Sequence, residues 1–275
     1  MEEASKTTLD REEVARFVRL ADAWWDANGP FRPLHRITPL RLTYLRDRLC
    51  QAFARDPKAA SSLSGLAILD IGCGGGLVAE PLARLGARVT GIDPAAENIA
   101  AARAHAQGAV VDVTYKVAAA EEVAGEGAQF DAVLLLEVIE HVPDVPAFLA
   151  CVAPLVRPGG VLILSTLNRT LKAYALAILG AEFILRWLPV GTHQWERFVK
   201  PEELASALRS AGLTLTDTTG LIYDPFADEW RLSPDTDVNY FLTAARRQVG
   251  DIGRSGIDDG SVRRSQGPRP RSPRP

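Results

Sequence analysis

The sequence predicts a doubly wound α/β fold with a mostly parallel, seven-stranded sheet. From Leu66 onward, short apolar runs alternate with stretches of helical spacing, which is typical of successive βαβ units. A glycine-rich segment follows the first apolar run directly, at the place where such sheets bind ligands. Two further apolar runs, 213–219 and 238–245, follow the last helical stretch and complete the sheet.

Helices are predicted ahead of the sheet. Residues 11–27 show the apolar spacing of one helix face, and Asn28-Gly29-Pro30 ends that pattern. A second helix is predicted from about Pro39 to Phe53, and residues 56–64 have the composition of a linker. We therefore expect residues 1–64 to form an N-terminal helical cap.

The sheet domain is predicted over residues 65–245. Arg157-Pro158-Gly159-Gly160 is predicted to be the turn before the fifth strand. An insertion at about 169–198 interrupts the alternating pattern after that strand. The tail, 246–275, has no aromatic residue and is rich in Arg and Pro, so we expect it to be disordered. The other expected strands are 66–71, 87–92, 113–117, 130–136 and 160–166, and the expected helices are 77–86, 95–107, 145–156 and 201–211.

Charge and cysteine content exclude several classes of protein. The 275 residues carry a net charge of −3. From Arg246 onward eight Arg face three Asp, a net +5, so residues 1–245 carry −8. So acidic a body is a poor binder of nucleic acid. The three cysteines lie far apart, which argues against disulfides and a cysteine zinc site. The acidic N-terminus and the lack of a long apolar run predict a cytoplasmic protein, at most resting on a membrane surface.

The glycine-rich segment predicts the cofactor class. A dinucleotide-binding GxGxxG pattern counted from Gly72 would need its third glycine at position 77, which is Leu77. An acid followed by GxGxG does match, as Asp70-Ile71-Gly72-Cys73-Gly74-Gly75-Gly76. This pattern resembles the first motif of the class I methyltransferases, which have a Rossmann-like fold and use S-adenosyl-L-methionine. Glycines here would let a ligand approach the backbone.

A second acid is expected where the next strand ends. Asp93 follows Val89-Thr90-Gly91-Ile92, and its two carboxylate oxygens suit the two ribose hydroxyls of an adenosyl group. The competing interpretation is a surface Asp that begins a turn before Pro94. After the third strand, Ala118-Ala119-Ala120 suits either the edge of an adenine or the start of a helix.

The fourth strand leads into three ionisable residues, Glu137, Glu140 and His141. At the carboxyl edge of a parallel sheet these groups are candidates for catalysis. They could orient a hydroxylated substrate, act as a base, or ligate a hard cation. The alternative is two solvated acids and a histidine with a structural hydrogen bond.

Several segments together resemble one family, the bifunctional O-methyltransferases of ubiquinone biosynthesis. The resemblance runs from about Glu12 to Ala244. The segments that carry it are Trp24-Trp25-Asp26, Pro33-Leu34-His35-Arg36-Ile37, residues 137–144 (EVIEHVPD), Ser165-Thr166-Leu167-Asn168-Arg169, Gly180-Ala181-Glu182, Gly191-Thr192-His193 and Asp237-Val238-Asn239-Tyr240.

The resemblance implies methylation of 2-polyprenyl-6-hydroxyphenol and 3-demethylubiquinol. It implies contact with other proteins of ubiquinone biosynthesis, and Mg²⁺ held by the three ionisable residues after the fourth strand. His141 is the nearest candidate base, and His193 is the other. The residues implied to contact S-adenosylmethionine are Arg41, Gly72, Asp93 and Leu136, and the glycine pattern adds Gly74.

The apolar segment 169–188 leaves two interpretations open. As one helix it would carry its charged residues within an arc of about 140°, and its uncharged core is too short to span a membrane. It is either a lid packed on the domain or an interfacial helix that meets a lipid-dissolved substrate at the inner membrane face. Two other functions also stay open: methylation of another small phenol or acid, and a non-catalytic S-adenosylmethionine-binding subunit.

Overall fold

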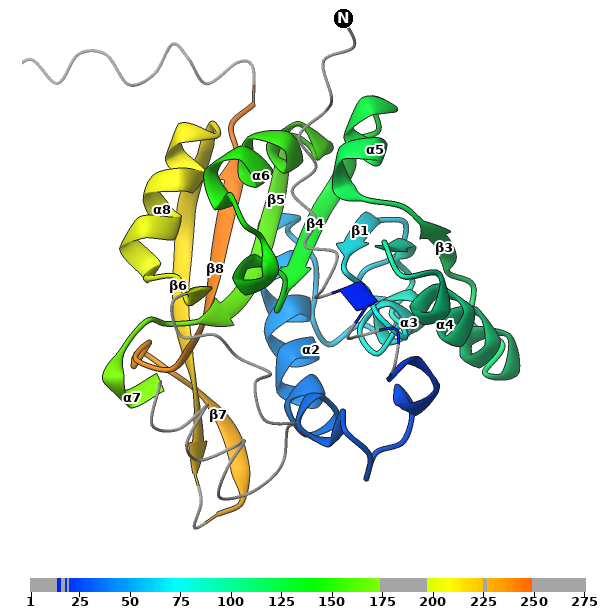
Figure 1. The fold of residues 1–275 in the computed structure, drawn as a ribbon. Coiled ribbons are helices and arrows are strands. Elements are labelled where there is room, and N and C mark those ends of the chain that lie inside the picture. Colours follow the sequence, from blue (N-terminus) through cyan, green and yellow to red (C-terminus); the bar gives the residue numbers. More distant parts are fainter. Residues whose placement is uncertain (1–13, 16–17, 19, 174–196, 225–226, 249–275) are drawn as a thin grey trace, which may run out of the picture.

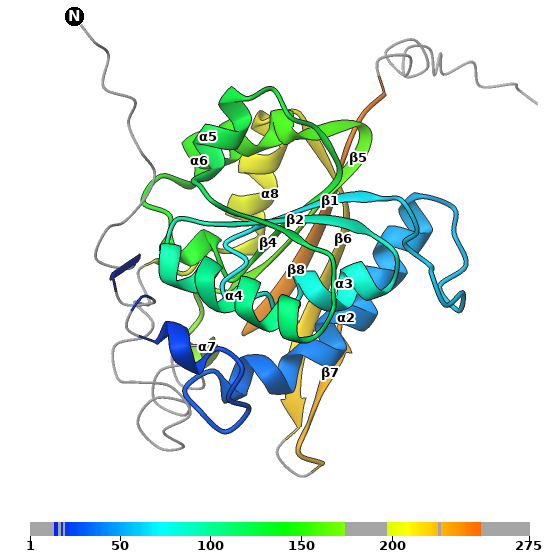
Figure 2. The same cartoon turned by 90° about the vertical axis from the view of Figure 1, so that its right-hand side faces the viewer.

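The computed structural model describes residues 14–15, 18, 20–173, 197–224 and 227–248. Its centre is one eight-stranded sheet with the strand order β3-β2-β1-β4-β5-β8-β6-β7. Helices α2, α3 and α4 cover one face of the sheet, and α5, α6 and α8 cover the other, as Figure 1 and Figure 2 show. The doubly wound α/β prediction is confirmed. None of the helices in the described ranges is long and apolar enough to cross a membrane.

The sheet is parallel through its first five strands and antiparallel beyond them. The strands are β1 Ala67–Ile71, β2 Arg88–Asp93, β3 Thr114–Val117, β4 Phe130–Leu136, β5 Val156–Leu167, β6 Leu213–Asp224, β7 Glu229–Ser233 and β8 Asn239–Arg246. The helices are η1 Ala21–Ala23, α2 Arg32–Ala52, α3 Ala79–Arg84, α4 Ala96–Gly108, α5 Ala120–Gly125, η2 Ile139–His141, α6 Val145–Val152, η3 Ala153–Leu155, α7 Leu171–Ala173 and α8 Pro201–Ser210.

The register of the parallel strands brings their carboxyl ends to one edge. Ile71 of β1 lies opposite Ile92 of β2 and, on its other side, Leu135 of β4. Leu136 lies opposite Ser165 of β5. The segments that follow these four strands therefore meet at one place, which is where open α/β sheets bind ligands.

Strand β7 was not predicted. The region between the last two predicted strands reads as a loop rich in Asp and Pro, but β6 continues to Asp224 and pairs with β7 as a hairpin. The hairpin is tied to α2, because Arg36 Nη2 lies 2.5 Å from Asp228 Oδ1. A short edge strand that carries charged residues gives little apolar alternation, so its signal in the sequence is weak.

Two predicted boundaries also differ. Helix α2 begins at Arg32 rather than near Pro39, because Pro33 occupies its first turn, where proline is favourable. The predicted turn at 157–160 lies inside β5. There the pairing jumps from Phe130–Val156 to Ala132–Val161, so the extra residues form an irregularity with Gly159 at φ +80°.

Some predicted segments lie outside the described residues. These are residues 11–13, 16–17 and 19 of the predicted 11–27 helix, most of the insertion with its Gly180-Ala181-Glu182 and Gly191-Thr192-His193 motifs, and the tail from residue 249 onward. The described part of 11–27 is helical at 14–15 and 18, but from residue 20 to 27 it holds only the 3₁₀ turn η1, so the prediction of one helix to residue 27 is wrong.

Candidate active site

The glycine loop after β1 is held against the end of β2. The backbone N–H groups of Gly72 and Cys73 both donate to the Ile92 carbonyl, at 2.8 and 3.0 Å. Gly72 and Gly74 have φ values of +70° and +52°, a region that favours glycine. The loop is therefore a fixed cradle beside Asp93.

Protein side chains occupy the space beside these glycines. A Cβ on Gly72 would lie 2.7 Å from Val138, and Cβ atoms on Gly74 and Gly75 would each lie 2.4 Å from Trp24. From the sequence these glycines are expected to admit a ligand. In the structure, the space that a side chain at these positions would take is occupied by the loop after β4 and by the N-terminal segment. The N-terminal segment places Trp24 against the glycine loop.

Replacing Gly74 by Ala should therefore destabilise the protein. The new methyl group would meet the Trp24 ring, and φ +52° is strained for alanine. We expect a loss of about 2 kcal/mol in the free energy of unfolding by urea. Gly125→Ala is the matched control, because a Cβ there meets nothing within 4 Å and should be neutral or stabilising. Equal stability of the two variants would contradict this packing.

Asp93 is buried, with 7% of its surface exposed, and its carboxylate is already hydrogen-bonded. Oδ1 accepts from Ala95 N at 2.9 Å and from Asn98 Nδ2 at 3.1 Å, and Oδ2 accepts from Gly74 N at 3.1 Å. Burial raises the pKa of Asp93, and these three donors lower it in part. Since a carboxylate has about four acceptor positions, one remains for a ligand. The alternative of a surface Asp is wrong.

Asp70, at the end of β1, is a second buried acid at this edge. It is 3% exposed, and burial, with a smaller contribution from the charge of Asp93, raises its pKa to about 7. The sequence pattern marks Asp70 as part of the motif but does not predict a role for its side chain. A buried carboxylate next to a second acid favours a cationic partner.

Arg41 of α2 reaches Glu137 after β4. Their side chains meet at 2.5 Å, and Ser165 Oγ donates to the same Glu137 oxygen at 2.8 Å. Glu137 has φ +57°, an uncommon conformation for a non-glycine residue. Arg41 is 5% exposed, and its Nε is buried without a hydrogen-bond partner. Arg41 therefore has a spare donor for an anionic ligand.

Glu140 is held by β5. It is 3% exposed, and Thr166 Oγ1 donates to its Oε2 at 2.7 Å. Burial raises the pKa of Glu140 to about 7, with a further contribution from the charge of Glu137. His141 ends the 3₁₀ turn η2 beside it. The interpretation of two solvated acids is therefore wrong for Glu140, which is inside the protein.

The predicted magnesium ligands do not form a metal site as arranged. Within the described ranges, no group of three or more His, Cys, Asp or Glu side chains could hold a metal ion. The physical reason is that both acids already accept hydrogen bonds from the protein. Arg41 and Ser165 donate to Glu137, and Thr166 donates to Glu140.

The remaining predicted residues are placed less directly. Leu136 is half-buried at the end of β4. Ala120 begins α5, so a helix does start there, while the adenine role of this segment stays a prediction. His193 lies outside the described residues.

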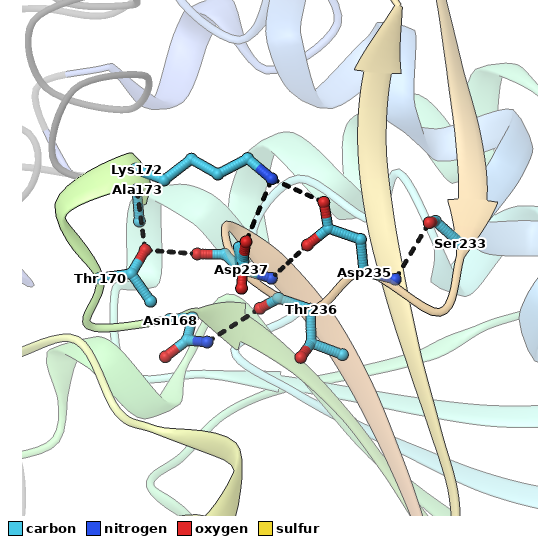
Figure 3. A network of polar contacts seen from close by, with 8 residues as sticks. All are labelled: Asn168, Thr170, Lys172, Ala173, Ser233, Asp235, Thr236 and Asp237. Carbon is cyan, nitrogen blue, oxygen red and sulfur yellow. Dashed lines mark hydrogen bonds and ion pairs between the residues drawn. The ribbon is translucent and has the colours of Figure 1, made fainter.

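A polar network fixes the chain where it leaves β5. Asn168 Nδ2 donates to the Thr236 carbonyl at 2.9 Å, and Thr170 Oγ1 donates to the Asp237 carbonyl at 2.6 Å, as Figure 3 shows. Lys172 Nζ lies 2.6 Å from Asp235 and 3.2 Å from Asp237. The turn before β8 thus holds the root of the insertion.

Comparison with known proteins gives consistent matches. A model of the methyltransferase domain family matches residues 40–218. The chain is 53% identical to the ubiquinone biosynthesis O-methyltransferase of Methylobacterium nodulans, over 90% of this chain and 99% of that protein. It is 54% identical to the protein of the same name from Rhizobium leguminosarum bv. trifolii, over 90% and 98%.

Solved structures share the fold. Magnesium protoporphyrin IX methyltransferase from Synechocystis PCC 6803 with bound S-adenosylmethionine aligns with a TM-score of 0.56 at 20% identity, over 88% of this chain and 100% of that one. The same enzyme with bound S-adenosylhomocysteine gives a TM-score of 0.52 at 24% identity, over 74% and 82%.

Proposed function

This chain belongs to the family of the ubiquinone biosynthesis O-methyltransferases and is an S-adenosylmethionine-dependent methyltransferase, and we propose that it methylates 2-polyprenyl-6-hydroxyphenol and 3-demethylubiquinol. The relatives' name supports the substrates. The observation that best supports the cofactor is that Asp70 and Asp93 lie at the glycine loop, while Arg41 is held by Glu137, next to the Val138 that packs against Gly72. An acid for an ammonium, an acid for a ribose and a cation for a carboxylate together match a nucleoside that carries a free amino acid.

Each proposed cofactor contact has its own physical reason. The free acceptor position on Asp93 would take a ribose hydroxyl. Asp70 would face the cofactor's ammonium group, which relieves the cost of a buried charge. The spare Nε donor of Arg41 would bind the cofactor's carboxylate. Gly72, Gly74 and Leu136 would line the cofactor through backbone and apolar contacts.

The proposed reaction is an in-line displacement at the methyl carbon. The phenolic oxygen forms a bond to that carbon as the carbon–sulfur bond breaks, and the electron pair stays on sulfur in S-adenosylhomocysteine. Catalysis is then mostly alignment of the hydroxyl with the methyl group. The hydroxyl, whose pKa lies near the value of about 10 for tyrosine, must also lose its proton. We propose His141, with Glu137 and Glu140 beside it, as the groups that accept and orient that proton.

Product analysis tests the function directly. We expect the purified protein to transfer the methyl group of S-adenosylmethionine to a polyprenyl catechol much faster than to a soluble catechol. Equal rates would favour a methyltransferase for another small phenol, and cofactor binding without any turnover would favour a non-catalytic subunit. The assay is run with magnesium and with a chelator, because loss of turnover in the chelator would show that a divalent ion takes part in the reaction.

We further propose that the chain works in the cytoplasm at a membrane surface, since its substrates carry lipid tails. The support is the apolar sequence of residues 169–188, most of which lie outside the described residues. Liposome co-sedimentation should fall several-fold for a variant with Leu185→Glu and Trp187→Glu. Equal binding of variant and wild type would contradict the membrane contact.

A further inference from the structure

The N-terminal segment contacts the glycine loop through one tryptophan. Trp24 is 7% exposed, stacks on Phe31 with ring centroids 3.9 Å apart, and lies against Gly74 and Gly75. Its indole N–H is also used: Nε1 donates to Asn98 Oδ1 at 2.8 Å. Trp24 thus connects the N-terminal segment to α4, close to Asp93 at the end of β2.

Asn98 connects Trp24 to Asp93 through a second hydrogen bond. Asn98 is 2% exposed, and its Nδ2 donates to Asp93 Oδ1 at 3.1 Å. An indole N–H can only donate, so the oxygen of the Asn98 amide must face Trp24 and its NH₂ group must face Asp93. Without that N–H the amide could turn over and present its oxygen to the carboxylate, which repels it.

We propose that Trp24 and Asn98 are positioning residues for the cofactor, which act together through Asp93. With Asn98 and Ala95 donating to Oδ1 and Gly74 donating to Oδ2, the acceptor position that remains is on Oδ2. The Trp24–Asn98–Asp93 chain of hydrogen bonds, here called the relay, keeps that oxygen turned toward the ribose. The inference rests on the proposed contact between Asp93 and the ribose.

The test compares two ligands. One is S-adenosylhomocysteine, and the other is its analogue without the two ribose hydroxyls. Trp24→Phe keeps the ring on the glycines and removes only the N–H. It should lower the affinity for S-adenosylhomocysteine roughly tenfold, about 1.4 kcal/mol, and the affinity for the analogue by less than about twofold. Asn98→Leu should do the same, and the double variant should be no worse than Asn98→Leu alone.

Trp25→Phe is the matched control. Trp25 Nε1 donates to the Gly75 carbonyl at 2.9 Å, so this variant removes a hydrogen bond to the same loop without touching Asp93. The affinity ratio of the two ligands should stay at the wild-type value. Melting curves verify that each variant is folded, and Asn98→Leu tests the relay if Trp24→Phe does not fold.

Two results would overturn the relay. One is an equal loss of affinity for both ligands in Trp24→Phe and Asn98→Leu, and the other is additive effects in the double variant. Asp93→Asn separates this failure from that of the proposed ribose contact. If Asp93→Asn abolishes the preference for the ribose ligand while the relay variants do not, the ribose contact stands and the relay is wrong. If Asp93→Asn leaves the preference intact, the ribose contact itself is wrong.

Discussion

Replacing Asp70 by Asn should stabilise the cofactor-free protein and weaken cofactor binding at the same time. Burial raises the pKa of Asp70 to about 7, so its ionised form is costly in the folded state. Against a pKa of about 3.9 in the unfolded chain, that cost amounts to at most about 4 kcal/mol above neutral pH. We expect Tm to rise by several degrees at about pH 8. The cofactor's ammonium would lose its partner, and its affinity should fall roughly 10- to 100-fold.

The effects of Asp70→Asn on stability and on cofactor affinity should both depend on pH. Between about pH 4 and pH 7 the folded state holds a proton on Asp70 that the unfolded chain has released, so this residue lowers stability as pH rises. The gain from Asp70→Asn should therefore shrink toward about pH 4. The wild-type affinity for S-adenosylmethionine should fall below about pH 7, and that of the variant should not. Asp112→Asn, at an exposed position, is the control, and equal effects of the two substitutions would contradict this account.

Removing Arg41 should destabilise the protein by about 3 kcal/mol. Arg41→Met removes the ion-pair partner of the Glu137 carboxylate, whose side chain is 22% exposed, while the hydrogen bond from Ser165 stays. Breaking a largely buried ion pair from one side removes the cation that offsets the buried charge of the acid. Urea unfolding of Arg41→Met measures the loss. Arg46→Met is the control, because Arg46 pairs with Asp47 in a partly exposed position and should matter little.

A double variant separates the two roles of Arg41. Adding Glu137→Gln to Arg41→Met removes the stranded charge, so most of the lost stability should return. Cofactor affinity should not return, because the donor for the cofactor's carboxylate is still missing. If the double variant binds S-adenosylmethionine as tightly as the wild type, Arg41 only neutralises Glu137 and the proposed carboxylate contact is wrong.

The central sheet could be predicted from the sequence because its strands are short, apolar and separated by clear helical stretches. Strand β4, at Phe130–Leu136, has the predicted bounds, and β1 differs from its prediction by one residue at its start. The edge hairpin could not be predicted, since β7 mixes Trp230 and Leu232 with charged residues and packs partly through Arg36 on α2. The local pattern of apolar residues does not indicate a contact with a helix that is far away in the sequence.

The candidate site was predicted only in part, for the same reason. The spacing of Asp70, Gly72 and Asp93 marks the cofactor edge, and these positions follow from strand ends. That Trp24 fills the space beside Gly74, and that Ser165 and Thr166 hold two acids, depends on contacts between distant segments. The magnesium prediction illustrates the limit, because three suitable residue types lie close in sequence while the fold gives two of them other partners.

A crystal structure of the protein with S-adenosylhomocysteine tests the central claim most directly, because it places the ligand among the residues that are proposed to hold it. We expect a ribose hydroxyl on Asp93 Oδ2, the ammonium group beside Asp70 and the carboxylate on Arg41, with Trp24 still donating to Asn98. A ligand whose ribose lies away from Asp93, or whose amino acid end contacts neither Asp70 nor Arg41, would contradict the account.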